Sequence, residues 1–105
     1  MKIQYTPKAI ERWTASLVYL TERNPTAALR LFNKVQASLL RLSTFPMLGS
    51  VVREYRHLPI REVIVEPYRF FYQIDRRRQT VWIVDVWHGA QWPSAPELPA
   101  PPDRF

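Results

Sequence analysis

The chain contains no cysteine and only two histidines, His57 and His88. The missing cysteines exclude disulfides, thiolate nucleophiles and cysteine-bound zinc. The two histidines fall in different predicted elements without the close spacing of a metal-binding pair, so a transition-metal site would need carboxylates from distant parts of the chain. We therefore expect neither a metal ion nor another cofactor.

Long apolar runs are also missing. No stretch approaches the roughly 20 apolar residues that cross a bilayer, and the opening residues MKIQYTPKAIERW lack the apolar run of a signal peptide. We therefore expect a cytoplasmic protein without a membrane partner. The 105 residues leave room for one domain with a hydrophobic core.

Lysine occurs only at Lys2, Lys8 and Lys34, whereas arginine supplies the other twelve of the fifteen basic residues. Against nine acidic residues these give a net charge of +6, which favours an anionic partner such as nucleic acid or an acidic protein segment. A basic surface that binds nothing is the alternative interpretation of the charge alone. Arginine suits bidentate contact with phosphate, although a GC-rich genome gives the same bias.

The first half of the chain carries clear signals for one strand and two helices. Residues 1–6 alternate apolar and polar side chains, which predicts a short strand. Thr6 and Asn24 each offer a side-chain oxygen as a helix N-cap, and each precedes a proline, which suits the first helical position. These signals predict helices over about 7–23 and about 25–44, joined tightly into a hairpin. The expected inward-facing residues are Ile10, Trp13, Leu17 and Leu20 in the first helix, and Ala28, Phe32, Val35, Leu39 and Leu42 in the second.

The second half predicts three strands. Pro46 and Gly49 end the helical pattern, and residues 51–59 predict a loop or an irregular strand. Strands are expected over about 60–65, about 68–74 and about 80–87. The order β-α-α-β-β-β predicts an α+β fold, in which a two-helix hairpin packs on one face of a small, mainly antiparallel sheet and can leave the other face open. We expect residues 1–92 to form this domain and residues 93–105, which contain five prolines, to form an extended or disordered tail.

Three polar residues stand out in the last two strands. The period of two places Arg69 with Phe71 on the face away from the helices, where a concave sheet surface would receive a ligand; the pattern leaves open whether Arg61 shares that face. Asp85 lies in a strand that is apolar on both sides, and we expect it to form an ion pair with an arginine on a neighbouring strand. His88 ends the last strand, where an imidazole suits either proton transfer or a structural role.

Cleavage of RNA without a metal requires a base for the 2′-hydroxyl, a cation beside the scissile phosphate and an acid for the leaving oxygen. The candidates for these roles are Arg69, Arg61 and His88, together with Glu54 or Glu62. The turn residues Arg76, Arg77 and Arg78 are candidate nucleic-acid phosphate contacts, although a solvated turn is the commoner meaning of such a run.

Five segments, taken in order, resemble the RelE/ParE superfamily, the toxins of bacterial type II toxin–antitoxin modules. They are NPTAALRLFNKV at the start of the second helix, FPMLG after it, REVIV, PYRFFYQI and VWIVDVWHGAQWP, and the resemblance covers about residues 3–93. It implies a toxin restrained by a cognate antitoxin in a hetero-oligomer, as in modules that stabilise plasmids. RelE-like members are ribosome-associated mRNA endonucleases (mRNA interferases), whereas ParE-like members inhibit DNA gyrase.

The resemblance can be followed residue by residue. Arg69 matches the arginine that RelE-like nucleases place in the equivalent strand. His88 falls where histidine-using nucleases keep their histidine, but many ParE-like sequences read LHG at the same place. The lysine pair of RelE-like enzymes is replaced by Ile60 and Glu62, and Gly89 is followed by Ala90 where the nucleases carry a tyrosine or a basic residue.

These departures favour ParE-like inhibition of gyrase. One alternative is a metal-independent, RelE-like endoribonuclease in which Arg69 steadies phosphate charge and His88 transfers protons, with Arg61 as a further candidate. The other is a family member that has lost toxicity and only binds. In each case we expect an acidic antitoxin segment to dock along the helix hairpin or to add to a sheet edge.

Overall fold

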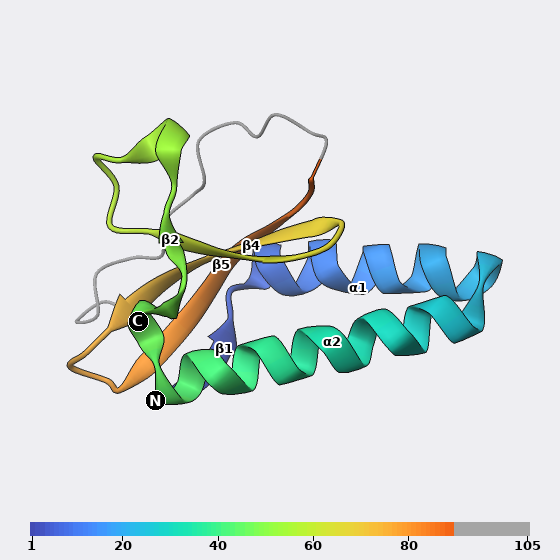
Figure 1. Ribbon diagram of the computed structural model, residues 1–105, viewed down its shortest axis with the longest axis horizontal. Helices are drawn as coiled ribbons and strands as arrows, with labels where there is room; N and C mark the ends of the chain where they lie inside the picture. The colour runs from blue at the N-terminus through green and yellow to red at the C-terminus, as the bar shows by residue number, and fades with distance from the viewer. Residues whose placement is uncertain (90–105) are drawn as a thin grey trace.

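The computed structural model of the protein describes residues 1–89, so the expected Pro-rich tail lies outside the described residues. The predicted α+β fold is confirmed (Figure 1). Its elements are β1 (Lys2–Tyr5), α1 (Pro7–Arg23), α2 (Pro25–Thr44), the 3₁₀ turn η1 (Pro46–Leu48), β2 (Ser50–Val51), the 3₁₀ turn η2 (Arg53–Tyr55), β3 (Arg61–Val65), β4 (Tyr68–Asp75) and β5 (Thr80–His88). Neither helix in this part of the chain is long and apolar enough to span a membrane.

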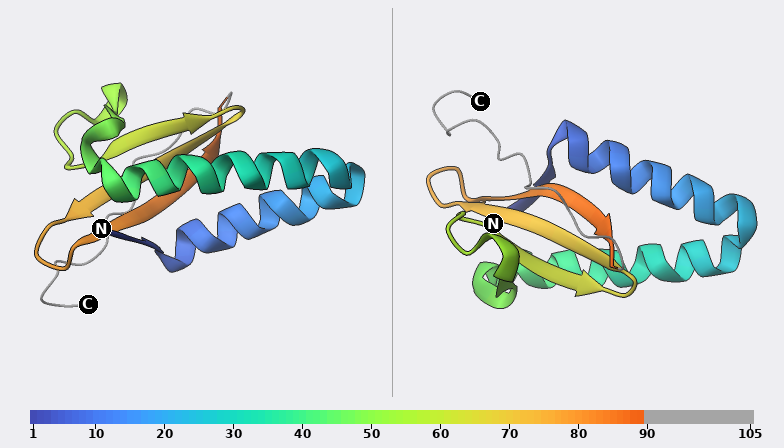
Figure 2. Two further views of the ribbon diagram at one scale, coloured as in Figure 1. Left: turned by 60° about the horizontal axis from the view of Figure 1, so that its bottom comes forward. Right: turned by 90° about the horizontal axis from the view of Figure 1, so that it is seen from above.

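The helices begin and end where the capping residues predict. The Thr6 side chain accepts a hydrogen bond from the amide of Ala9 at 3.3 Å, and the Asn24 side chain accepts one from the amide of Ala27 at 3.0 Å. The Asn24 amide also donates to the Leu20 carbonyl at 2.7 Å, so a single residue ends α1 and caps α2. Both views in Figure 2 show the resulting hairpin extending past the sheet at its tip.

The sheet has five strands in the order β1-β5-β4-β3-β2. Strand β1 pairs in parallel with β5, and all other neighbours are antiparallel. Strand β2 contributes only two residues to one edge. The register between β4 and β5 shifts by one residue between Phe71 and Tyr72. Phe71 lies opposite Asp85, whereas the next residue, Tyr72, lies opposite Ile83. Val84 is therefore an extra residue in β5.

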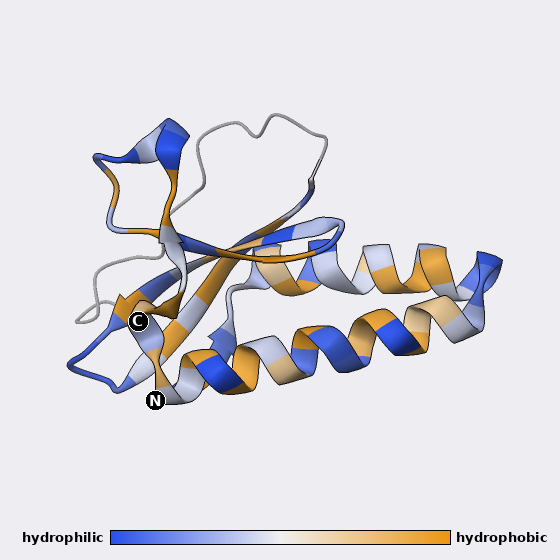
Figure 3. Cartoon of the chain, in the orientation of Figure 1, coloured by the Kyte–Doolittle hydropathy of each residue, from blue (hydrophilic) through white to orange (hydrophobic). Residues whose placement is uncertain are grey.

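The main core lies between the helices and the sheet. It contains residues from both helices and from β3, β4 and β5, namely Ala9, Trp13, Leu31, Val35, Leu39, Leu42, Val65, Phe70, Tyr72, Val81, Ile83 and Val86. The inward stripes were predicted with two errors, because Ile10 is 44% exposed and Phe32 is 39% exposed. The residues that point inward at these places are Ala9, which precedes Ile10, and Leu31, which precedes Phe32. Successive residues of an α-helix are about 100° apart around its axis, so a prediction that is wrong by one residue names a side chain on a different side of the helix. Figure 3 shows hydrophobic and hydrophilic residues alternating along both helices.

The sheet face away from the helices is partly covered. Val52 and Ile60, which flank η2, are buried against Phe71 and Val84 in a second hydrophobic cluster. The segment between β2 and β3 therefore folds onto this face. The expectation of an open face was wrong for this part of the sheet, because residues 51–59 supply apolar side chains that a simple loop would leave in water.

Candidate functional site

Arg69 lies on the sheet face away from the helices, as predicted, but it is held between two carboxylates. Its Nε donates to Glu62 Oε2 at 3.0 Å and its Nη1 donates to Glu54 Oε2 at 3.0 Å. Its Nη2 donates to both carboxylates, at 2.5 Å to Glu62 and 3.3 Å to Glu54. Glu62 belongs to β3 and Glu54 to η2, so we call these three residues the arginine clamp. It joins the covering segment to the sheet.

The clamp is largely removed from solvent. The side chains of Arg69, Glu54 and Glu62 are 14%, 13% and 13% exposed. Hydrogen bonds from Arg69 lower the pKa of Glu54. Burial acts against the charged form of Arg69, but the hydrogen bonds to Glu54 and Glu62 outweigh it and raise the pKa of Arg69. The guanidinium is therefore already satisfied by two fixed anions, and a phosphate group would have to displace them.

Arg61 and Arg69 lie on opposite faces of the sheet. In the register of β3 and β4, Arg61 is opposite Tyr72 whereas Glu62 is opposite Phe71. Tyr72 belongs to the core beneath the helices and Phe71 to the cluster on the other face. Arg61 thus projects on the helix side, where its Nη1 donates to the Gly49 carbonyl at 2.7 Å.

His88 is exposed at the end of β5 and lies opposite Tyr68. The two rings meet edge to face with their centroids 5.5 Å apart. Because Tyr68 packs against the core beneath the helices, His88 is on the helix side, away from the arginine clamp. The three residues predicted for RNA cleavage, Arg69, Arg61 and His88, are not brought together in the described part of the chain.

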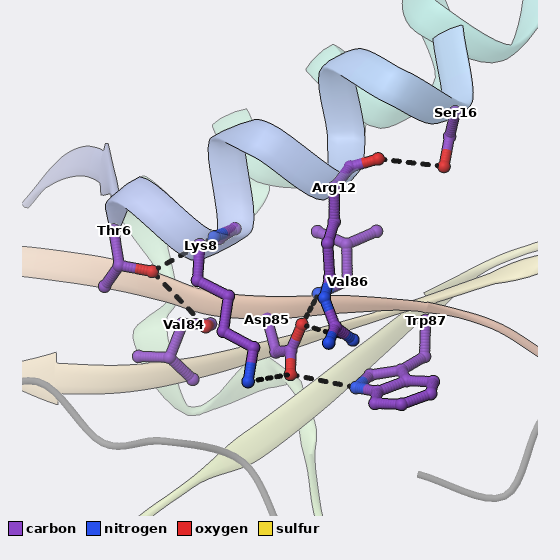
Figure 4. Close-up of polar contacts among 9 residues, drawn as sticks. Thr6, Lys8, Arg12, Ser16, Val84, Asp85, Val86 and Trp87 are labelled. Atoms are coloured by element: carbon purple, nitrogen blue, oxygen red, sulfur yellow. Dashed lines mark hydrogen bonds and ion pairs between the residues drawn. The ribbon is translucent and has the colours of Figure 1, made fainter. Parts of the chain in front are cut away.

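Asp85 forms the expected ion pair, but its partners come from a helix (Figure 4). Arg12 Nη1 lies 3.3 Å and Lys8 Nζ lies 4.0 Å from the fully buried carboxylate. The Val86 amide and the Trp87 indole N–H also donate to it, at 2.8 and 2.9 Å. The predicted partner on a neighbouring strand was wrong, because α1 packs across β5 and presents two cations spaced four residues apart on one helical face.

The three turn arginines, Arg76, Arg77 and Arg78, are exposed between β4 and β5. The Asp75 side chain stabilises the turn by accepting a hydrogen bond from the Arg78 amide at 3.0 Å. His57 is exposed too, with its ring centroid 6.4 Å from that of Tyr55. Within residues 1–89, no cluster of three or more histidine, aspartate or glutamate side chains is placed to hold a metal ion.

Two depressions are lined by both apolar and basic side chains, and sequence reasoning found neither of them. The first, which we call the hairpin pocket, has a volume of about 380 Å³ and is lined by Tyr19, Leu20, Ala27, Arg30, Leu31, Lys34, Glu66, Pro67, Tyr68 and His88. The second, which we call the sheet-end groove, also has a volume of about 380 Å³ and is lined by Met47, Val51, Arg56, Leu58, Pro59, Ile60, Arg61, Tyr72, Ile74 and Arg76. They share no residue.

Together, these features define a small α+β domain with two depressions lined by apolar and basic side chains, in which Arg69 lies on one face of the sheet and Arg61 and His88 on the other. The chain matches, over residues 3–93, the family model described as ParE toxin of type II toxin-antitoxin system, parDE. The protein therefore belongs to the ParE toxin family, and the resemblance seen in the sequence is confirmed. Membership makes it a toxin of a type II toxin–antitoxin system and implies a cognate antitoxin as its partner. A search of curated proteins found no matching relative.

Proposed function

We propose that this toxin inhibits growth by ParE-like inhibition of DNA gyrase in the cytoplasm, and that a cognate antitoxin neutralises it by direct binding. The observation that supports this choice over RNA cleavage is the arginine clamp. Arg69, the residue that a nuclease would use to steady phosphate charge, donates to Glu54 and Glu62 at distances of 2.5–3.3 Å.

The separation of the other candidates supports the same choice. Proton transfer and phosphate stabilisation must act on one scissile group, so the responsible side chains must converge within hydrogen-bonding reach of it. Arg69 and His88 project from opposite faces, and Arg61 lies opposite Tyr72 while His88 lies opposite Tyr68, four residues away along β4. Four residues of an extended strand span roughly 13 Å.

The hairpin pocket is the surface that best fits the antitoxin. Arg30 and Lys34 lie one turn apart on α2, and both line the pocket together with the apolar Leu31 and the aromatic Tyr68. Along the same helix Leu29 and Leu40 are 63% and 71% exposed. An acidic, amphipathic segment would pair with the two cations and cover the apolar side chains, forming a toxin–antitoxin hetero-oligomer.

The choice between gyrase and RNA can be tested by inducing the protein in bacteria and comparing the wild type with His88→Ala. His88 is exposed, so its removal leaves the fold intact. We expect inhibited supercoiling by purified gyrase, a DNA-damage response and uncleaved transcripts, with little change in His88→Ala. Cleaved transcripts that become intact in His88→Ala would overturn the proposal in favour of a ribonuclease. Unaffected growth and uninhibited gyrase would indicate a member that only binds.

The antitoxin surface can be tested by co-purification with the product of the adjacent reading frame. Reversing the pocket charges with Arg30→Glu and Lys34→Glu should weaken the complex by at least about tenfold. The matched control is Lys2→Glu with Arg41→Glu, which changes the net charge equally at exposed positions outside both depressions. Equal losses in both variants would show that only net charge matters and would exclude the pocket as the docking site.

A further inference from the structure

A third depression, with a volume of about 540 Å³, lies between α1 and the end of β5. It is lined by α1 between Arg12 and Tyr19, by β5 between Val86 and His88, and by Tyr68 of β4. We call it the aromatic pocket. It borders the hairpin pocket, with which it shares Tyr19, Tyr68 and His88, and the proposed function does not use the rest of it. Its volume is within the range of about 300–1,000 Å³ that is typical of small-molecule sites.

Four rings line the aromatic pocket, those of Tyr19, Tyr68, Trp87 and His88. The Tyr68 ring is held from two sides, because it meets His88 edge to face at 5.5 Å between centroids and meets the buried Trp13 in the same way at 5.7 Å. Tyr19 is 58% exposed and His88 is exposed as well, so the pocket presents aromatic surface to solvent. Such a surface suits a planar aromatic ligand, which can stack on the rings or meet their edges.

One wall of the aromatic pocket is a cation that is fixed in place. Arg12 Nη1 lies 3.3 Å from Asp85 Oδ1, and its guanidinium carbon lies 4.5 Å from the centroid of the Trp87 ring. The Trp87 indole N–H donates to Asp85 Oδ2 at 2.9 Å, so one buried carboxylate holds both side chains (Figure 4). The Arg12 side chain is still 36% exposed. A guanidinium that is already ordered loses little entropy when an anion binds to its open side.

The charges around the aromatic pocket also favour an anion. Among the described residues, no acidic side chain lines it. The adjoining hairpin pocket adds Arg30 and Lys34, against the carboxylate of Glu66. The guanidinium carbon of Arg23 lies 3.3 Å from the centroid of the Tyr19 ring and brings a further positive charge to that ring. A negatively charged ligand is therefore attracted to this end of the molecule, whereas a cation is repelled.

Aromatic rings beside a fixed guanidinium match a molecule that carries both complementary features. We propose that the aromatic pocket is a small-molecule site, which binds a planar aromatic ring bearing a phosphate or carboxylate group. The ligand ring packs against Tyr19, Tyr68 and His88, and its anionic group contacts Arg12. Nucleotides and aromatic carboxylic acids share this chemistry, so both are tested.

The test is isothermal titration calorimetry on the full chain with two probes, adenosine monophosphate and indole-3-acetate. Adenosine and indole-3-acetamide lack the charge of these probes, and inorganic phosphate and acetate lack the ring. We expect at least one probe to bind with one site per chain, and at least about tenfold more tightly than its uncharged and its ringless analogue. Tighter binding of adenosine monophosphate would identify the ligand as a nucleotide, and tighter binding of indole-3-acetate would identify it as an aromatic acid.

Three variants locate the bound probe. Tyr19→Ala and His88→Ala each remove an exposed ring, and each should weaken binding by at least about threefold. Arg12→Lys keeps a cation beside Asp85 but removes the planar guanidinium, and it should weaken binding by at least about fivefold. The matched control is Phe45→Ala, which removes a ring that is 62% exposed outside the pocket and should change the affinity by less than about twofold. Circular dichroism and the urea midpoint verify that each variant is folded.

The proposal is overturned if neither probe binds, or if the uncharged or ringless analogues bind as tightly as the probes. It is also overturned if Phe45→Ala weakens binding as much as Tyr19→Ala does. A twelve-nucleotide single strand that binds more tightly than adenosine monophosphate and loses affinity in Tyr19→Ala would overturn it as well, since the surface would then be a polynucleotide site. None of these measurements depends on toxicity, on gyrase or on the antitoxin.

Discussion

Replacing Arg69 with methionine tests whether the arginine clamp is structural. Arg69→Met keeps much of the apolar stem but leaves Glu54 and Glu62 facing each other, each about 13% exposed. Removing one partner of a fully buried ion pair costs about 3–5 kcal/mol. The remaining exposure lets water screen part of this repulsion, so we expect a loss of about 2–3 kcal/mol in the free energy of unfolding. With a urea m-value of about 1–1.5 kcal/mol per molar for this size, the midpoint should fall by about 2 M.

The control separates the clamp from a general effect of losing an arginine. In the background of Glu54→Gln/Glu62→Gln, the same Arg69→Met change should cost less than about 1 kcal/mol, because no carboxylate is left unpaired. The reasoning is refuted if Arg69→Met shifts the midpoint by less than about 0.5 M at an unchanged m-value. It is equally refuted if the effects of the three substitutions are additive.

The clamp also predicts a dependence on acid. The pKa of Glu54 is lowered from its ordinary value of 4.5, so its contribution to stability is fully present above that value and is lost as the pH falls through the lowered pKa of the folded state. The midpoint difference between wild type and Arg69→Met should therefore be constant from neutral pH down to about pH 5 and should shrink below about pH 4. A difference that grows with acidification would contradict the assignment.

Three other predictions concern the fold. Gly49→Ala should lower the free energy of unfolding by about 1–3 kcal/mol in urea titrations, because an added Cβ would lie 2.5 Å from both the Glu62 carbonyl oxygen and the Tyr72 hydroxyl; a variant as stable as the wild type would contradict this packing. Asp85→Asn should lower the free energy of unfolding by about 1–3 kcal/mol, because the buried carboxylate accepts two N–H hydrogen bonds and lies beside two cations. The thermal midpoint measures this loss, and an unchanged midpoint would count against the network in Figure 4. Burial raises the pKa of Tyr5 to about 12 and also raises the pKa of Tyr72, so ultraviolet titration should show both phenols ionising after an ordinary tyrosine. Stability should fall as the pH rises from about 10 through the raised value of Tyr5, and Tyr5→Phe should reduce the late phase by one phenol; a late phase of unchanged size would contradict the assignment.

The helices were predictable because their signals are local. An N-cap oxygen and a following proline act within four residues, and both pairs, Thr6 with Pro7 and Asn24 with Pro25, set the helix starts as predicted. The inward stripes were less accurate, since the face that a helix buries depends on how it is rotated over the sheet. Leu31 and Phe32 are both large and apolar, and only the packing places the former inward.

The candidate site was less predictable because its contacts join distant segments. The alternation in β4 placed Arg69 on the correct face, but Glu54 approaches it from a 3₁₀ turn whose path depends on the burial of Val52 and Ile60. Asp85 shows the same limit. Its burial predicted an ion pair, whereas the identity of its partner depends on how the helix layer crosses the sheet.

The parallel pairing of β1 with β5 has a consequence for synthesis of the toxin. Residues 2–5 find their partners only at residues 80–83, so the strand made first has no place in the sheet until the strand made last has left the ribosome. An incomplete chain that ends before β5 leaves both β1 and β4 without a neighbour that each needs. The five-stranded sheet therefore cannot be completed until β5 has been synthesised, and its assembly depends on pairing between residues far apart in the sequence.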